Sequence, residues 1–393
     1  MLREGIIERS HSDFSAPVVL VRKPDGTHRF CVNYKKLNKK TKFDAEPMNR
    51  PDDIMANLAA KKYFSKLDFT RGFWQIPMEQ NSREYTAFNT QSGCYHFVRL
   101  PFGLVNSPAT YNRMMRKLLN GVDDVDNYVD DVLGHTTSWE EHISMLREVF
   151  ERIRQAGLTI KPSKCLFGYF TVKFLGHNVG QGKLTPQDNT VQRILSCSHP
   201  TTKKQLRSFL GLVGWYQKFI PNYSMITAPL TTLLQKKQPN VLKWNEEHES
   251  AFRILKKAIV SEPMLRTPDF SLPFLVQTDA SETAIGAALL QKFGNDVLPV
   301  AFASRKLQPR ETRYTVGERE CLAIIFALKK FDRYLYNKEF ILYTDHSSLT
   351  SLKQKSPENS RLLRWSLFLE NYKFQVKAIK GKENVLADFL SRM

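Results

Sequence analysis

Residues 127–133 read Asn-Tyr-Val-Asp-Asp-Val-Leu and set two acids, Asp130 and Asp131, side by side among apolar residues that favour β-strands. Adjacent carboxylates in such a setting lose hydration and repel each other unless a cation neutralises them. A divalent metal ion would resolve that conflict. An Asp-Asp pair on its own, however, is more often a solvated hairpin turn than a metal site. The choice between the two therefore depends on the rest of the chain.

Two neighbouring segments favour the metal site. Residues 63–68, Tyr-Phe-Ser-Lys-Leu-Asp, predict a strand that ends in a third acid, Asp68. Residues 100–103, Leu-Pro-Phe-Gly, precede a helix predicted over 107–120. Three acids at two strand ends can share two divalent cations, and nucleotidyl transfer needs that arrangement. One Mg²⁺ activates a primer 3′-hydroxyl, while the other holds the triphosphate and the leaving pyrophosphate.

The first half of the chain alternates strands and helices, which is typical of an α+β sheet domain. Residues 18–34 predict a β-hairpin with basic side chains at and beyond its tip, around Pro-Asp-Gly at 24–26. Residues 51–60 predict a short helix, and residues 139–156 predict an amphipathic helix that Gly157 ends.

The middle of the chain reads as helical. Residues 203–219 and 246–260 predict helices, with Thr202 and Asn245 as their N-caps. Prolines then punctuate a polar stretch, which makes residues 263–272 the best candidate for an interdomain linker.

The last third of the chain carries a second group of acids. Its pattern predicts the order β, β, β, α, β, α, α, beginning near Phe274. Asp279 and Asp345 end two of these strands, and Glu320 and Asp388 lie in helices. Each acid alone would usually be an exposed charge, but the two strands that end in Asp are apolar enough to be buried. Buried acids at strand ends need a partner.

Composition indicates a nucleic-acid partner. The 58 Lys and Arg against 39 Asp and Glu leave a net charge of +19, which favours polyanion binding that weakens with salt. The alternative is that the basic balance only keeps the protein soluble. The five cysteines are widely spaced, so neither a disulfide framework nor a zinc cluster is suggested. No signal peptide is evident, and no uncharged run approaches the roughly 20 residues that span a bilayer. We expect a soluble intracellular protein of two or three domains.

Over essentially its whole length the sequence resembles the reverse transcriptases of gypsy-class (Metaviridae) LTR retrotransposons. The matching segments are APVVLVRKPDGTHRFCVNYKKLN (16–38), YFSKLDFTRGFWQIPM (63–78), FVRLPFGLVNSPATYNRMM (97–115), NYVDDVLGHTTSWEEH (127–142), LTIKPSKCLF (158–167), FLGH (174–177) and TKKQLRSFLGLVGWYQKFIPNYS (202–224). The resemblance implies a right-hand polymerase of fingers, palm and helical thumb, followed by an α/β ribonuclease H-like domain with a mixed five-stranded sheet. The expected domains are fingers and palm over 1–181, with the fingers truncated at the amino terminus, a helical thumb or tether over 182–262, the linker over 263–272 and the ribonuclease H-like domain over 273–393.

The resemblance also implies roles for individual polymerase residues. The expected metal-binding catalytic acids are Asp68, Asp130 and Asp131, and the expected nucleotide-binding residues are Lys23, Arg29, Phe73, Phe102 and Gly103. Phe73 matches the aromatic residue that blocks a ribose 2′-hydroxyl and so selects deoxynucleotides; the alternative is an ordinary core phenylalanine. Lys23 is uncertain by one position, because Arg22 could take its place. The expected primer grip is Phe174, Leu175, Gly176 and His177, which could also be mere strand packing.

Four segments resemble the motifs of retroelement ribonuclease H domains: TDAS (278–281), ERECLAIIFALKKF (318–331), YTDHSSL (343–349) and GKENVLADFLSR (381–392). In that family Asp279, Glu320, Asp345 and Asp388 would be the catalytic acids that hold two metals for hydrolysis of RNA paired to DNA. Glu320 matches the family position and Glu318 is expected to be solvated. Many ribonucleases H carry a histidine before the last acid, whereas residues 378–384 contain none.

The resemblance therefore implies an enzyme, an RNA- and DNA-directed DNA polymerase with ribonuclease H activity that serves retrotransposon replication. It implies two Mg²⁺ ions per site, with Mn²⁺ as a substitute. It also implies an RNA template, a DNA primer and template, an RNA/DNA hybrid and dNTPs as ligands, with no membrane. A homodimer or other Gag and Pol products are further candidate partners. The expected location is the cytoplasm, in a virus-like particle. A nuclear phase is left as an open alternative.

Two departures motivate an alternative. Asn33 stands where the family usually has Asp, and the chain begins inside what resembles the helix before the fingers hairpin. No protease or integrase segment is evident, so the chain looks like a piece of a Pol polyprotein. The alternative is a non-catalytic nucleic-acid-binding remnant or domesticated fragment. An RNA-dependent RNA polymerase ranks far lower, because it should not carry the second group of acids.

Overall fold

The computed structural model describes residues 1–22, 26–58, 60–260, 265–344 and 360–378. Their contacts divide the chain into two compact units. The amino-terminal unit comprises Met1–Asn57 and Lys61–Val172, and the carboxy-terminal unit comprises Leu58–Ala60 and Lys173–Met393. The domain bounds expected from the sequence stay a prediction.

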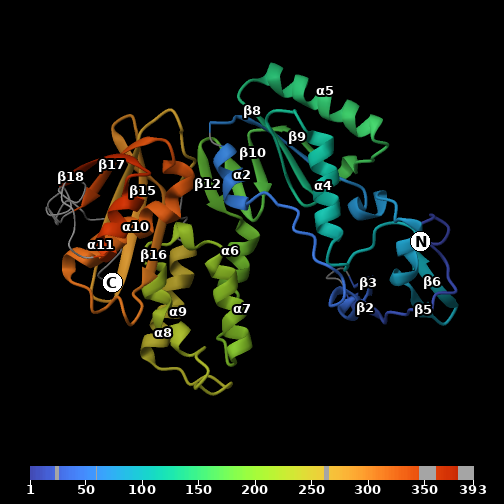
Figure 1. Cartoon of the computed structure of the whole chain (residues 1–393), viewed down its shortest axis with the longest axis horizontal. Helices are drawn as coiled ribbons and strands as arrows, with labels where there is room; N and C mark the ends of the chain where they lie inside the picture. The colour runs from blue at the N-terminus through green and yellow to red at the C-terminus, as the bar shows by residue number, and fades with distance from the viewer. Residues whose placement is uncertain (23–25, 59, 261–264, 345–359, 379–393) are drawn as a thin grey trace. The chain divides into compact units, whose positions relative to one another are not determined.

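An antiparallel sheet forms the centre of the amino-terminal unit. Its strands, in spatial order, are β7 (Val125–Tyr128), β8 (Asp131–Thr136), β4 (Tyr63–Asp68) and β9 (Leu166–Tyr169). Two helices, α4 (Ser107–Leu119) and α5 (Trp139–Gln155), lie beside these strands (Figure 1). Leu67 and Val132 point from the sheet into the core that both helices complete with Met115 and Val149. Because successive strand residues point to opposite faces, Lys66, Asp68 and Asp131 lie on the other face.

The ends of both helices agree with their sequence signals. Ser138 and Glu141 form a capping box at the start of α5, and Gly157, with φ +65°, follows its end. In α4 the proline at position 108 occupies the first turn, where its missing N–H leaves no helical bond unmade.

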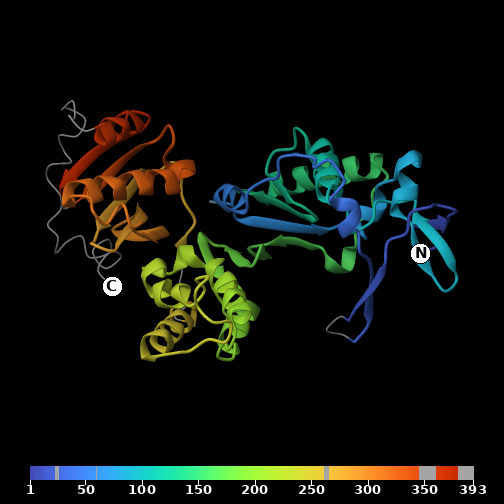
Figure 2. The same ribbon diagram turned by 60° about the horizontal axis from the view of Figure 1, so that its bottom comes forward.

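A smaller sheet and a hairpin complete this unit. The sheet has the order β1 (Ile7–Arg9), β6 (Gly93–Phe97) and β5 (Phe88–Thr90). The predicted hairpin consists of β2 (Val18–Arg22) and β3 (His28–Val32), and it extends away from the body of the unit (Figure 2). The short helices are α1 (Lys35–Asn38), α2 (Pro51–Asn57) and α3 (Gln80–Arg83), with the 3-10 turns η1 (Gly72–Gln75), η2 (Glu84–Thr86) and η3 (Pro162–Lys164).

Four helices in the middle of the chain belong to the carboxy-terminal unit: α6 (Asp188–Leu195), α7 (Lys203–Gly214), α8 (Tyr223–Thr232) and α9 (Glu246–Val260), with the turn η4 (Gln217–Phe219). Two of them, α7 and α9, were predicted from the sequence, but α7 ends at Gly214 rather than at residue 219, and α6 and α8 were not predicted. Thr202 caps α7 as predicted, and Asn245 Oδ1 accepts the backbone N–H of His248 at the start of α9. Phe209 and Phe252 join α7 to α9, with 4.6 Å between their ring centroids. Beside these helices runs a sheet with the order β10 (Thr171–Phe174), β11 (His177–Gly180), β12 (Lys183–Pro186) and β13 (Leu265–Arg266).

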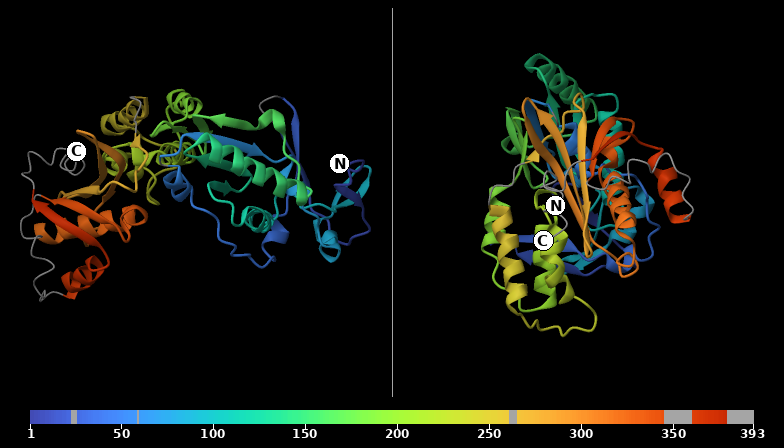
Figure 3. Two further views of the ribbon diagram at one scale, coloured as in Figure 1. Left: turned by 90° about the horizontal axis from the view of Figure 1, so that it is seen from above. Right: turned by 90° about the vertical axis from the view of Figure 1, so that its left-hand side faces the viewer.

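The mixed five-stranded sheet expected from the resemblance is present. Its order is β16 (Asp296–Lys306), β15 (Ala284–Phe293), β14 (Phe274–Ala280), β17 (Glu339–Thr344) and β18 (Lys373–Ala378). The pairs β14–β17 and β17–β18 are parallel and the others antiparallel. The helices α10 (Val316–Leu335) and α11 (Ser360–Leu369) lie on one side of this sheet (Figure 3).

The strand β18 corrects the order of elements predicted from the sequence, which had no strand between the helix that ends near residue 369 and a last helix from Asn384. That last helix lies outside the described residues. Within the described ranges, no helix combines the length and the apolar character that crossing a membrane requires.

A buried histidine ties α5 to the central sheet of the amino-terminal unit. His142 is fully buried, with Nε2 2.7 Å from Ser65 Oγ and Nδ1 2.9 Å from Thr136 Oγ1. Ser65 Oγ also accepts the backbone N–H of Gly168, on β9. Burial lowers the pKa of His142 below its usual 6.5, and the nearby His135 lowers it further.

The amino-terminal unit should therefore lose stability in mild acid. The folded state disfavours protonation of His142, so the unfolded chain binds more protons once the pH falls towards and below about 6.5. The free energy of unfolding should then drop by up to about 1.4 kcal/mol per pH unit from this group. Urea titrations between pH 7.5 and 5 measure the slope. His142→Gln should flatten it, whereas His11→Gln, at an exposed position, should not. An equal slope in all three chains would contradict this expectation.

Candidate active sites

The hairpin between β7 and β8 carries the paired acids. Tyr128 faces Asp131 in the last pair of the ladder, so Val129 and Asp130 alone form the turn. Val129 has φ +54°, a left-handed conformation that costs a β-branched residue on the order of 1–3 kcal/mol. A positive φ at this position matches the twist of the two strands. The turn therefore holds Asp130 exposed at its tip, at the cost of backbone strain.

The third predicted acid lies directly across the sheet from this hairpin. Asp68 ends β4 and is the Cα partner of Asp131, which begins β8. The side chains of Asp68 and Asp131 are 32% and 33% exposed, so a solvated cation can reach them. The structure thus gathers Asp68, Asp130 and Asp131 at the ends of adjacent strands, as predicted, while their catalytic role stays a prediction.

Lysines, rather than further acids, face two of these carboxylates. Lys66 Nζ is 2.7 Å from Asp131 Oδ1, and Lys164 Nζ is 3.6 Å from Asp68 Oδ2. Across the described ranges, no three His, Cys, Asp or Glu side chains are already grouped closely enough to hold a metal ion. The donor chemistry nevertheless fits a hard cation, because carboxylate oxygens are the ligands that Mg²⁺ takes from proteins.

Aromatic side chains pack against one another beside the acids. The Phe73 ring, 9% exposed, lies 4.9 Å from the Phe102 ring and 5.2 Å from the Tyr111 ring, measured between centroids. Phe73 therefore lies in the core and also borders Phe102, which is 55% exposed. Burial raises the pKa of the Tyr111 hydroxyl, and the charges of Asp130 and Asp68 raise it further.

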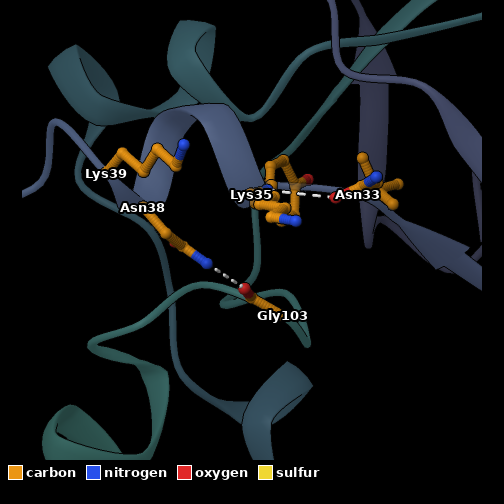
Figure 4. Close-up of a pocket in the computed structure, with 7 residues that line it drawn as sticks. Asn33, Lys35, Asn38, Lys39 and Gly103 are labelled. Atoms are coloured by element: carbon orange, nitrogen blue, oxygen red, sulfur yellow. Dashed lines mark hydrogen bonds between the residues drawn. The ribbon is translucent and has the colours of Figure 1, made fainter. Parts of the chain in front are cut away.

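A cavity of about 560 Å³ lies between α1, the end of β3 and Gly103 (Figure 4). Asn38 spans it by donating from Nδ2 to the Gly103 carbonyl oxygen at 2.8 Å and accepting the Val105 N–H at 2.9 Å. Gly103 has φ +98°, and a Cβ there would meet the Val32 carbonyl oxygen at 3.3 Å. A side chain at this position would therefore be strained. Asn33 Oδ1 accepts the Lys35 N–H at 3.1 Å, a bond that an aspartate oxygen would also make.

The two basic residues predicted to bind a triphosphate belong to the β2–β3 hairpin. Arg29 lies on β3, exposed and opposite Val21. Lys23 lies outside the described residues, so the choice between it and Arg22 stays open.

In the carboxy-terminal unit, the predicted primer grip is the turn between β10 and β11. Leu175 and Gly176 form this turn, both with positive φ. The side chains of Phe174 and His177 are buried. Two residues that the sequence did not single out hold the turn: Trp215 Nε1 donates to the Leu175 carbonyl oxygen at 3.3 Å and the Tyr216 hydroxyl donates to that of Gly176 at 2.7 Å. Their position just after α7 was the available signal, since Trp and Tyr with polar tips often bridge a core and a surface.

Two acids of the second group lie where β14 contacts α10. Asp279 is 2% exposed and Glu320, on α10, is 4% exposed. Glu320 Oε1 accepts the backbone N–H of Ala280, next to Asp279, at 3.2 Å. Asp345 and Asp388 lie outside the described residues, so their place beside these two stays a prediction.

Glu318 was expected to be solvated, and the structure corrects this. Its side chain is only 14% exposed and lies 2.9 Å from Arg361 Nη1. It also completes the capping box with Thr315 at the start of α10. Glu318 thus has a structural role that Glu320, further along the helix, does not share.

Comparison with known proteins agrees with this geometry. A family model described as reverse transcriptase (RNA-dependent DNA polymerase) matches residues 21–179, and one described as an RNase H-like domain found in reverse transcriptase matches residues 269–372. The chain is 39% identical over its whole length to 37% of the retrovirus-related Pol polyprotein from transposon 297 of Drosophila melanogaster. It is 35% identical over its whole length to 30% of the Tf2-3 transposon polyprotein of Schizosaccharomyces pombe. The chain thus spans about a third of the length of these relatives.

Solved structures show the same fold. A foamy viral protease-reverse transcriptase dRH in complex with double-stranded DNA matches with a TM-score of 0.87 and 28% identity, over 96% of this chain and 68% of that one. The foamy viral protease-reverse transcriptase in complex with an RNA/DNA hybrid matches with a TM-score of 0.83 and 27% identity, over 100% and 53%. The fold, the two family models and the relatives agree with one another. The chain carries a reverse transcriptase domain and a ribonuclease H-like domain, and its relatives are Pol polyproteins of gypsy-like LTR retrotransposons.

Proposed function

We propose that the chain synthesises DNA on RNA and DNA templates and cleaves the RNA strand of an RNA/DNA hybrid. The observation that carries this proposal is Asp68 facing Asp131 across β4 and β8, with Asp130 in the adjoining turn. A foamy viral reverse transcriptase of the same fold was solved with an RNA/DNA hybrid, which supports a hybrid as a ligand here. The net charge of +19 supports a polyanionic partner as well.

In the polymerase site, Asp68, Asp130 and Asp131 would hold two Mg²⁺ ions. When bound, the ions would supply activation of the primer 3′-hydroxyl and neutralisation of the developing phosphate charge. The chain's own contribution is position: strand pairing fixes Asp68 against Asp131, and the strained Val129 fixes Asp130.

The residues around the acids would bind the incoming nucleotide. Arg29, and Lys23 at the hairpin tip, would donate charge-assisted hydrogen bonds to a triphosphate. Phe102 and the Gly103 backbone would lie against the nucleotide, since the missing side chain at Gly103 permits close approach. The Leu175–Gly176 turn, held by Trp215, would support the primer end.

In the nuclease site, Asp279, Glu320, Asp345 and Asp388 would hold the second pair of ions. The burial of Asp279 and Glu320 supports this role, because buried carboxylates need compensation by a cation or by hydrogen bonds. An A-form hybrid is recognised through phosphates and 2′-hydroxyls, so neither activity should be strongly sequence-specific.

Primer extension on poly(rA)/oligo(dT) with Mg²⁺ tests the polymerase, and RNA release from a labelled hybrid tests the nuclease. A folded chain that extends primers no better than its Asp130→Asn variant would sink the polymerase proposal. If that chain still bound hybrid in a salt-dependent way and cleaved none, the binding-remnant alternative would be favoured.

Substituting Phe73 with valine should let ribonucleotides enter. Phe102 and Tyr111 hold the Phe73 ring in place, so its removal leaves space for a 2′-hydroxyl. The ratio of kcat/KM for dNTP over rNTP should fall by roughly 10- to 100-fold. Single-nucleotide extension measures this ratio. Phe69→Val is the matched control, because Phe69 is buried in the same core cluster and should affect stability alone. An unchanged dNTP preference in Phe73→Val would show that the gate assignment is wrong.

A further inference from the structure

Lys66 shares a face of β4 with Asp68, because alternate residues of a strand point the same way. Its Cα partner on β8 is Leu133, so Asp131 lies diagonally across from it and within reach. The Lys66 side chain is 22% exposed and that of Asp131 is 33% exposed, with 2.7 Å between Nζ and Oδ1. The pair is therefore partly shielded from solvent and oriented by the sheet.

Lys66 lies where it can offset the repulsion between the carboxylates of Asp68 and Asp131. Asp68 and Asp131 face each other in the ladder, and like charges directly opposite destabilise a sheet. The other lysine near these acids, Lys164, is 58% exposed and 3.6 Å from Asp68, which makes a looser contact that solvent screens. Lys66 is the better placed of the two to keep the strand ends together before any metal ion arrives.

We propose that Lys66 is a positioning residue that serves as a resident counter-ion of the polymerase site. In the metal-free protein it neutralises Asp131, and it gives up that carboxylate oxygen when a divalent cation binds. The proposal rests on the metal-dependent polymerase function proposed above. It also accounts for the lysine that lies beside each of the two facing carboxylates.

Two opposite effects follow for Lys66→Met. The metal-free strand ends lose a counter-charge and should open more often. The metal ion no longer has to displace an ammonium group and should bind more tightly. A residue with a purely structural role would not improve metal binding when it is removed, so the second effect separates the two explanations.

Hydrogen exchange in the presence of a chelator tests the first effect. Amides of β7 and β8 should exchange about two- to fivefold faster in Lys66→Met, the range expected for a partly exposed ion pair. In an Asp131→Asn background the same substitution should have no effect, because the partner is gone. The matched control is Lys61→Met, which breaks the Lys61–Asp124 pair just before the same strand and should act alike in both backgrounds. An equal effect of Lys66→Met in both backgrounds would overturn the proposal.

Mn²⁺ titration followed by electron paramagnetic resonance tests the second effect. All chains carry Asp279→Asn and Glu320→Gln, so that the nuclease acids do not obscure the signal. Lys66→Met should bind Mn²⁺ about two- to fivefold more tightly than the parent chain. Lys66→Arg, which keeps the charge, and Lys61→Met should bind like the parent. Unchanged or weaker binding by Lys66→Met, or a parent chain that binds no Mn²⁺, would refute the counter-ion role.

Primer extension by the same chains keeps this inference separate from the proposed function. If the chains extend primers but their Mn²⁺ affinity does not change when Lys66 is substituted, only the counter-ion proposal is refuted. Chains that show the Lys66–Asp131 coupling, but extend no primer, would refute the polymerase alone.

Discussion

Replacing Asp130 with asparagine is expected to abolish DNA synthesis and to leave RNA cleavage intact. Asp130 is exposed at the tip of the β7–β8 turn, and asparagine has nearly the same size, so the substitution should not disturb the fold. It removes one of three charges that would bind the metal ions. A bound metal ion contributes several kcal/mol to the stabilisation of a transition state, so kcat should fall on the order of 10³-fold.

Steady-state primer extension on RNA and DNA templates measures this loss, and hybrid cleavage by the same preparation shows that the chain is folded. Asp123→Asn is the matched control, since Asp123 is an exposed acid just before β7. Synthesis at the parental rate by Asp130→Asn, or an equal loss in Asp123→Asn, would show that the paired acids do not perform catalysis.

The Glu320→Gln change is expected to produce the reverse phenotype. Glutamine keeps the volume of the buried side chain and an oxygen that can accept the Ala280 N–H, but it removes the charge that would bind a metal ion. Release of RNA from a labelled hybrid should fall on the order of 10²- to 10³-fold, while primer extension continues.

Glu318→Gln provides the comparison on the same helix. Glu318 caps α10 and pairs with Arg361, so its substitution should cost about 0.5–2 kcal/mol of stability and leave cleavage in place. If Glu318→Gln abolished cleavage and Glu320→Gln did not, the choice between the two glutamates would be reversed.

Much of the fold could be predicted because the decisive signals are local. The strand over residues 63–68 is indicated by the residues of that segment itself. The helix caps at Thr202 and Asn245 depend on residues within one helical turn. The strand β18 also had a local signal, since Phe374 and Val376 alternate with polar residues. Its two lysines and its glutamine lowered its apparent hydrophobicity, which is why it was missed.

Asp68 and Asp131 lie at strand ends, as the sequence predicted, yet the lysines that contact them could not be predicted. The contact between Lys66 and Asp131 depends on the register of β4 against β8, and a shift of one residue would put Lys66 on the other face. The bonds from Trp215 and Tyr216 to the β10–β11 turn join residues 40 apart in the chain. Nothing in either segment alone specifies such a contact.

The strand β13 has a practical consequence for anyone who wants to separate the two proposed activities. Leu265 and Arg266 pair with β12 of the sheet beside the helices, while three residues later the Asp269 backbone exchanges hydrogen bonds with the Gln291 side chain of β15. A cut at the start of the 263–272 segment would leave a polymerase fragment with the edge of β12 bare, and bare edges invite aggregation. A nuclease-free version of this protein should therefore end after residue 267, and a nuclease expressed alone should begin no later than residue 268. Separation at this boundary also breaks the contact between α8 and β16, where Ser224 Oγ donates to the Ser304 carbonyl oxygen at 2.6 Å.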